Sequence, residues 1–133
     1  MYYLAVKDHI MIAHSFRGEI FGPAQNMHGA TFEVEVEVRR EQLDDHGLVC
    51  DIGQAITILR EVLLAFNYKN LDDITEFKEK NTTTEFMAGE IFERMRQRIS
   101  KGELGPGTAG TLHSMKVLLK ESSVAWAAFE GLI

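Results

Sequence analysis

The stretch from Thr31 to Arg39, "TFEVEVEVR", limits the possible folds of this chain more than any other. Phe32 and three valines occupy every second position, and three glutamates fill the positions between them. Successive side chains of a β-strand point to opposite faces of the sheet, so this alternation predicts a strand with one buried and one wet face. Such a sheet needs other elements of the chain over its apolar face.

The remaining segments supply two helices and further strands. Apolar residues at helical spacing predict a helix from Ile52 to Phe66. The "TTTE" of Thr82–Glu85 has the spacing of a capping box, in which each side chain bonds the other's free backbone N–H, and it predicts the start of a second helix. Strands are expected over Tyr2–Phe16, Leu48–Ile52, Leu112–Lys120 and Val124–Phe129, and loops over Arg17–Met27, Asn67–Asn81 and Lys101–Gly110.

The order of these elements predicts an α+β fold. The strands come in pairs without a strand–helix–strand rhythm, which favours an antiparallel sheet with the two helices packed on one face. A length of 133 residues fits a single domain that covers residues 1–133. One sheet in so short a chain has open edges, and oligomerisation is one way to cover them.

Composition and charge argue against several classes of function. The net charge of −6 disfavours a nucleic-acid or anionic-membrane partner, because either favours a basic face. No apolar run approaches the roughly 20 residues that cross a bilayer, and the first residues lack the basic start of a signal peptide, so a cytoplasmic location is expected. The single cysteine, Cys50, excludes an internal disulfide and a zinc finger, and its apolar neighbours predict a core residue.

Two histidines are the first candidates for chemistry. His14 lies near the end of the first predicted strand, and His28 lies at the start of the next. If the two strands pair across the loop between them, the imidazoles come together and could begin a zinc site, although a catalytic zinc normally has three protein ligands. The alternative is that each histidine is an ordinary polar residue at a strand end, and spacing alone leaves both readings open.

Segments in order along nearly the whole chain carry a family resemblance. They are "AHSF" (13–16), "HGATF" (28–32), "DDHGLVCDI" (44–52), "NLDDI" (70–74), "NTTTEF" (81–86) and "LLKESSVAWAAFE" (118–130). They are similar, in turn, to the motifs Ala-His, His-Gly-His, Asp-x-x-Gly-x-Val-x-Asp-Phe, Leu-Asp-His-x-x-Leu-Asn, Pro-Thr-x-Glu-Asn and a late strand that ends in Glu-Thr or Glu-Ser. The chain thus resembles the 6-pyruvoyltetrahydropterin synthase / 6-carboxytetrahydropterin synthase family.

The resemblance implies a tunnelling fold, a ring-based homo-oligomer that is a hexamer, and elimination of triphosphate from dihydroneopterin triphosphate. It implies Zn²⁺, held by His14 and His28, that polarises the side-chain oxygens of the substrate. Glu121 matches the glutamate that anchors the pterin ring, a task for which two carboxylate oxygens can accept the adjacent N–H and amino donors. Thr83 and Thr84 match the threonines beside the pterin, and helix capping is their alternative or additional role.

The chain departs from the family pattern at its catalytic positions. The third zinc histidine falls on Ala30, and the catalytic cysteine falls on Ala24. The Asp-His pair of the proton relay falls on Asn67 and Tyr68. A third zinc ligand would therefore have to come from another histidine of this chain or from a neighbouring subunit.

Two residues of the loop between the histidine strands are further candidates. Glu19 lies close in sequence to the missing cysteine, and a carboxylate in a drier pocket has a raised pKa that suits a base. Its alternative is a solvated loop residue. Arg17 is a candidate contact for a phosphate or carboxylate of the substrate.

Three hypotheses follow. The first is a divergent lyase that acts on the side chain of a dihydroneopterin-type substrate, with Glu19 as base. The second is a pterin- or purine-binding protein that kept the pocket and lost catalysis. The third is an enzyme of another reaction class that acts on a related purine-like ring.

Overall fold

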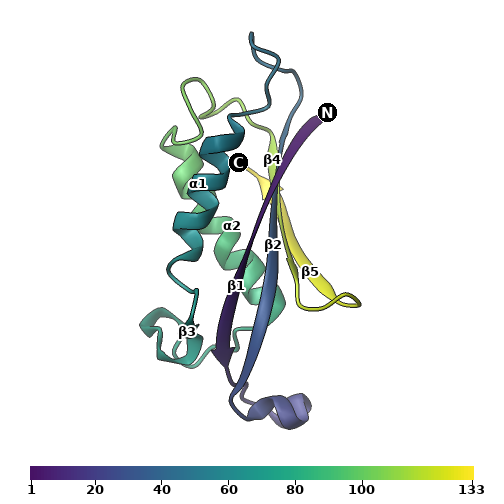
Figure 1. Ribbon diagram of the computed structural model, residues 1–133, viewed down its shortest axis with the longest axis vertical. Helices are drawn as coiled ribbons and strands as arrows, with labels where there is room; N and C mark the ends of the chain where they lie inside the picture. The colour runs from purple at the N-terminus through teal and green to yellow at the C-terminus, as the bar shows by residue number, and fades with distance from the viewer.

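The computed structural model describes residues 1–133 and contains one five-stranded sheet (Figure 1). The strands are β1 (Tyr2–His14), β2 (His28–Arg40), β3 (Lys69–Asn70), β4 (Ser114–Lys120) and β5 (Trp126–Leu132), in the spatial order β3-β1-β2-β4-β5. The three long ladders are antiparallel, which confirms the predicted α+β class. The two-residue strand β3 pairs parallel with β1, so the complete sheet is mixed.

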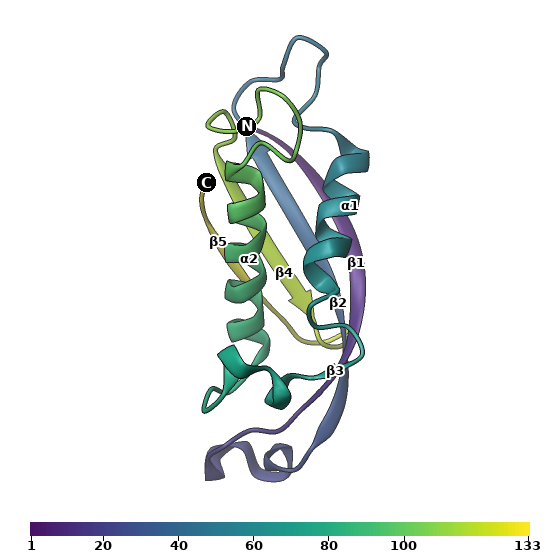
Figure 2. The same cartoon turned by 90° about the vertical axis from the view of Figure 1, so that its left-hand side faces the viewer.

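Two α-helices cover one face of the sheet, as predicted (Figures 1 and 2). Helix α1 (Ile52–Leu63) packs on β1, and helix α2 (Thr84–Ser100) packs on β4 and β5. The core lies between this layer and the sheet, and a single cluster of 28 buried apolar residues fills it. Every apolar residue of the alternating stretch in β2, from Phe32 to Val38, is at most 2% exposed. Cys50 is also buried, as predicted, and burial raises the pKa of its thiol to about 11.

Two local predictions are wrong because side-chain caps decide where the helices begin. Leu48–Ile52 forms no strand; Asp51 instead caps α1 by accepting a 2.8 Å hydrogen bond from the Gln54 backbone N–H. Helix α2 is capped by Thr83, whose hydroxyl accepts from the Phe86 N–H at 3.1 Å. The residue predicted to cap it, Thr82, is 1% exposed and has a different partner.

The predicted polar loop Asn67–Asn81 contains β3 and two short 3₁₀ turns, η2 (Leu71–Asp73) and η3 (Thr75–Phe77). It also contributes to the core, because Leu71 is 0% and Phe77 is 3% exposed. The Phe77 ring stacks on Phe66 with centroids 5.8 Å apart and meets Phe86 edge-on at 5.4 Å. Isolated apolar residues in a polar segment have no periodicity, so sequence analysis missed them.

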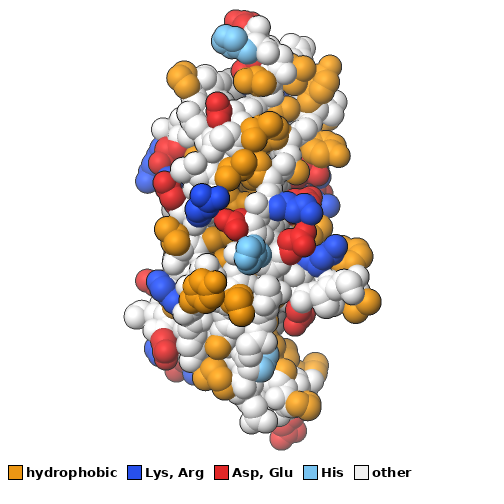
Figure 3. Space-filling model, in the orientation of Figure 1, with side chains coloured by type: hydrophobic (Ala, Val, Ile, Leu, Met, Phe, Trp, Pro, Cys, Tyr) orange, Lys and Arg blue, Asp and Glu red, His pale blue; other side chains and the backbone are white.

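The other face and both edges of the sheet are open within one chain. Charged side chains pair across the open face, as Lys7 does with Glu33, and Figure 3 shows charges of both signs between surface hydrophobic groups. Strand β1 has no outer partner except β3 at Ile12 and Ala13, and β5 has none. Trp126 on β5 is 57% exposed. None of the helices is both long enough and apolar enough to cross a membrane.

Candidate functional site

The pairing of β1 with β2 brings the two candidate histidines together. His14 lies directly opposite His28 in the ladder, and their ring centroids are 4.6 Å apart with an interplanar angle of 62°. Both point to the face that the helices cover, because His14 continues the buried row of Ile10 and Ile12. His14 is 2% exposed, whereas His28 is half-buried. The imidazole pair therefore forms the inner end of a site at the end of the sheet.

Each imidazole has its Nδ1 engaged by the protein. His28 Nδ1 lies 2.8 Å from the Asn26 carbonyl oxygen, which can only accept, so this nitrogen donates its proton. His14 Nδ1 lies 3.1 Å from the hydroxyl of Thr82. Neither Nε2 atom has a hydrogen-bond partner in the protein. Every fully buried side-chain nitrogen or oxygen of the chain does have a hydrogen-bond partner. The two Nε2 atoms are therefore the ones open to a ligand.

The surroundings of His14 favour its neutral form. Burial lowers the pKa of His14, and the neighbouring His28 acts in the same direction. A hydrogen bond to Thr82 and the charges of Asp72 and Glu121 oppose this shift. Thr82, which bonds His14, stands two residues before Thr84, which bonds Glu121, so the start of α2 joins the imidazole pair to the carboxylate near the end of the chain.

Glu121 follows β4 and meets the first turn of α2. Its carboxylate oxygen Oε2 accepts a long, 3.4 Å hydrogen bond from the hydroxyl of Thr84. Thr83 uses its own hydroxyl as the helix cap, so Thr84 is the threonine that accompanies the carboxylate. Glu121 itself is exposed, and both of its oxygens remain accessible to a ligand with paired donors.

An aromatic contact joins the loop between β1 and β2 to the imidazole pair. The Phe16 ring lies 4.5 Å from the His14 ring and 5.4 Å from the His28 ring, and Phe21 lies 4.8 Å from Phe16. The Phe16 N–H donates to the Ala24 carbonyl at 3.1 Å. The loop, which contains the 3₁₀ segment η1 (Glu19–Gln25), is thus folded back against the site.

Glu19 and Arg17 both lie in this loop, and both are exposed. Glu19 has no hydrogen bond or ion pair to the imidazoles, so a single chain does not supply the drier pocket expected for a base. The Arg17 backbone is held by two hydrogen bonds to the Asn81 side chain, at 2.8 and 3.0 Å. Arg17 lines a small hollow of about 70 Å³ whose lining also includes Lys78 and Lys80 and the carboxylates Asp72 and Glu79.

Two residues of the candidate site were not predicted from the sequence. Thr82 bonds His14, and Asp72 accepts a 2.5 Å hydrogen bond from the hydroxyl of Ser15, the residue that follows β1. The sequence did hold a signal for a role of Thr82. Only one of three consecutive threonines can be the N-cap of a helix, so the other two are free for other contacts. Nothing in the sequence around Asp72 distinguishes it from Asp73.

The side chains of one chain do not fit a three-ligand zinc centre. Ala30 shares a strand face with His28 but offers only a methyl group. His9 lies on the open face of β1, with its side chain 73% exposed beside Asp8. No group of three or more His, Cys, Asp or Glu side chains is arranged to hold a metal ion.

Asn67 and Tyr68, which stand at the positions of the family's proton relay, both make structural contacts. The Asn67 side-chain oxygen accepts from the Met11 N–H at 3.0 Å, and the Tyr68 N–H donates to the Met11 carbonyl at 2.7 Å. The Tyr68 side chain is 78% exposed. Both residues tie the end of α1 to the edge of β1.

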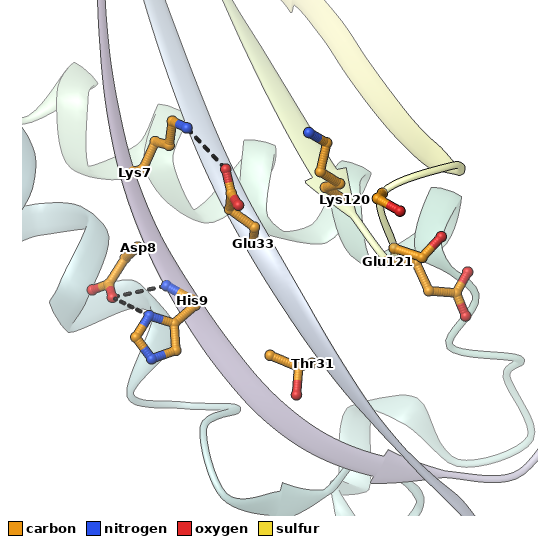
Figure 4. A pocket seen from close by; sticks show the side chains of 9 residues that line it. Lys7, Asp8, His9, Thr31, Glu33, Lys120 and Glu121 are labelled. Carbon is orange, nitrogen blue, oxygen red and sulfur yellow. Dashed lines mark hydrogen bonds and ion pairs between the residues drawn. The ribbon is translucent and has the colours of Figure 1, made fainter.

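A separate hollow of about 750 Å³ lies on the open face of the sheet (Figure 4). Its lining is entirely polar and includes Lys7, Glu33 and Glu121, but neither His14 nor His28. In Figure 4 the Glu121 carboxylate points away from the Lys7–Glu33 pair. Glu121 therefore lies at the border between this hollow and the imidazole neighbourhood.

Comparisons with other proteins agree on one family. Residues 3–132 match the family described as "6-pyruvoyl tetrahydropterin synthase". The chain is 29% identical to 6-pyruvoyl tetrahydrobiopterin synthase of Dictyostelium discoideum over 107 residues, which are 79% of this chain and 73% of that protein. It is 32% identical to the Drosophila melanogaster protein of the same description over 90 residues, 65% of this chain and 54% of that protein.

Solved structures show the same fold. The Caenorhabditis elegans 6-pyruvoyl tetrahydropterin synthase superposes with a TM-score of 0.80 at 23% identity, covering 98% of this chain and 95% of that one. A Plasmodium vivax structure superposes with a TM-score of 0.70 at 16% identity, covering 99% of this chain and 98% of that one. The latter is described as a catalytic-residue mutant in which a glutamate is replaced by cysteine.

Proposed function

Because the chain belongs to the 6-pyruvoyl tetrahydropterin synthase family, we propose that it is a pterin-processing lyase acting on the side chain of a dihydroneopterin-type substrate. One observation carries the proposal. Thr82 bonds buried His14, and Thr84, two residues later, bonds Glu121, while the His14 ring is 4.6 Å from that of His28. A carboxylate suited to the ring and an imidazole pair suited to the side chain thus share one neighbourhood.

Glu121 is proposed to hold the heterocycle. A pterin offers an N–H and an amino group side by side, and the two oxygens of a carboxylate accept both at once. Thr84, which already reaches Oε2, would keep the carboxylate oriented. Thr83 would act only through the helix start that it caps.

The imidazole pair is proposed to orient the side chain of the substrate. In its neutral form, His28 donates from Nδ1 to a carbonyl, so its Nε2 presents a lone pair that can accept from a substrate hydroxyl. Burial lowers the pKa of His14, which favours its neutral form, and its Nε2 offers the same lone pair when Nδ1 donates to the Thr82 hydroxyl. We assign no step to zinc, since the chain supplies two imidazoles and no third ligand.

Glu19 is proposed as the base. The P. vivax structure described as a catalytic-residue mutant shows that this relative has a glutamate among its catalytic residues. Glu19 lies in the loop that Phe16 joins to the imidazoles. Its exposure in one chain means that a bound substrate, or a second copy of the chain, has to exclude water around it. Arg17 would then meet an anionic group on the side chain.

A homo-oligomer is proposed because both sheet edges are open and apolar side chains flank them. Tyr2 and Tyr3 on β1 are 52% and 65% exposed, and Leu132 on β5 is 73% exposed. A free edge of one copy can pair with the free edge of the next. We expect sedimentation equilibrium to give six times the chain mass of 15.0 kDa, and a monomer at micromolar concentration would contradict the ring.

The test is turnover of dihydroneopterin triphosphate and dihydroneopterin, followed by mass spectrometry of the pterin product and by release of triphosphate. We expect a product with an altered side chain. Glu19→Gln should slow its formation by about 10²–10⁴-fold, the usual contribution of a general base. Gln25→Glu, which adds a carboxylate at the exposed end of the same segment, should not restore the rate in the Glu19→Gln background. Turnover unaffected by Glu19→Gln would remove Glu19 from the mechanism.

The second candidate function is a pterin- or purine-binding protein without catalysis. The positions of the family's catalytic groups are occupied in this chain by Ala24, Ala30 and the Asn67–Tyr68 pair. Their loss favours a protein that binds without catalysis. Tight pterin binding with no chemical change of any substrate would support it. Absence of both binding and turnover would contradict both functions.

A further inference from the structure

The imidazole pair is oriented as half of a metal centre. Metal-binding histidines usually give the N–H of one ring nitrogen to a carbonyl, carboxylate or other acceptor, which fixes the ring and directs the second nitrogen at the metal. The Asn26 carbonyl and the Thr82 hydroxyl occupy that position at His28 and His14, at 2.8 and 3.1 Å. Both Nε2 atoms are left without a protein partner. The outer contact of a zinc ligand is therefore present at His28, and Thr82 provides the second at His14 when its hydroxyl accepts from Nδ1.

The missing ligand position is Ala30. It stands two residues after His28 on β2 and opposite Ile12 on β1, so it is the diagonal neighbour of His14. Diagonal neighbours on one face of an antiparallel pair are about 7–8 Å apart, within the reach of long side chains. The Cβ of Ala30 leaves the sheet on the same face as both imidazoles, and Ala30 is only partly buried.

No other histidine replaces it within the chain. His9 lies on the opposite face of the sheet. His46 lies in the turn after β2. His113 precedes β4, and its backbone N–H donates to the carbonyl of Arg39. Arg39 in turn pairs with Tyr3 at the start of β1. Both are therefore at the far end of the sheet from His14.

We infer that His14 and His28 form a zinc site that is one ligand short, that Ala30 occupies the missing position, and that the natural chain holds no resident zinc. Two imidazoles alone fall below the three protein ligands of zinc sites that keep an open position. A histidine at position 30 supplies the third from the same strand face. The inference concerns metal binding alone and holds whichever substrate the protein takes.

The test compares the natural chain with Ala30→His and with a matched control, Ala5→His. Ala5 lies on β1 but on the open face, four residues from His9 and away from the imidazole pair. Each protein is loaded with Zn²⁺, dialysed and assayed for zinc per chain. Each is also titrated with Co²⁺, whose visible absorption reports a tetrahedral site.

We expect Ala30→His to retain one zinc per chain and to develop the tetrahedral Co²⁺ spectrum. Its zinc affinity should exceed that of the natural chain by at least about 100-fold, since loss of even an outer contact of a metal ligand commonly costs 10–100-fold. The natural chain and Ala5→His should retain far less than one zinc. Adding His14→Ala to Ala30→His should abolish the gain.

Two results would overturn the inference. One is a natural chain that keeps stoichiometric zinc through dialysis and loses it on His14→Ala, because a third ligand would then already exist. The other is a folded Ala30→His protein that binds zinc no better than Ala5→His. If circular dichroism shows that Ala30→His does not fold, Ala30→Cys tests the same position with a smaller zinc ligand, against Ala5→Cys, and is judged by the same criteria.

Discussion

Glu121→Ala should reduce the affinity for a reduced pterin, measured by fluorescence titration, by on the order of 100-fold or more. Two hydrogen bonds to a charged carboxylate are lost, and each contributes about 1.5–3 kcal/mol. Glu121→Gln should recover little of the affinity, because an amide offers one acceptor where the ring needs two. Glu121 is exposed, so we expect its loss to change the free energy of unfolding by less than about 0.5 kcal/mol.

Glu85→Ala is the matched control for this measurement. Glu85 is an exposed carboxylate in the first turn of α2, one residue after Thr84, and it has no side-chain hydrogen bond. Its removal should leave pterin affinity within about twofold, because a surface charge that touches no ligand contributes little. Equal affinity for the Glu121→Ala and natural proteins would show that Glu121 does not anchor the ring, and the site would then have to be sought elsewhere.

Phe77→Ala should lower the free energy of unfolding by about 3–5 kcal/mol, the usual cost of truncating a buried phenylalanine to alanine. Phe77 is 3% exposed, and its ring contacts Phe66 and Phe86. Alanine would leave a cavity between α1 and the start of α2, close to the threonines that precede the helix. Chemical denaturation monitored by circular dichroism measures the loss.

Ile20→Ala is the control for stability. Ile20, like Phe77, is a large apolar residue in a 3₁₀ segment, but it is 91% exposed, so we expect a change within about 0.5 kcal/mol. Equal effects of the two substitutions would mean that the 67–81 segment does not pack as described. A large loss at Phe77 alone would show that a segment with a polar sequence belongs to the core.

Much of the fold follows from periodicity. The alternation in β2 determines which side chains enter the core, and the same rule places His14 and His28 on one face once their strands pair. The helical spacing after Asp51 identifies α1. These predictions succeed because a repeating pattern of burial averages over many residues of one element.

Single-residue features were harder to predict. The capping box pointed to Thr82, whereas Thr83 caps the helix, because three adjacent threonines satisfy nearly the same local pattern. Leu48–Ile52 is apolar enough for a strand, yet Asp51 caps α1 there. Boundaries of this kind depend on one hydrogen bond, which a pattern of hydrophobicity does not report.

By itself, the sequence determined the two-layer α+β arrangement, the buried face of β2 and the family. Only the tertiary structure decided that Thr82 bonds His14, 68 residues away, and that Thr84 reaches Glu121 across 37 residues. The physical reason is that periodicity records how one element meets the core. Contacts between distant side chains arise only when packing brings the ends of different elements to the same place.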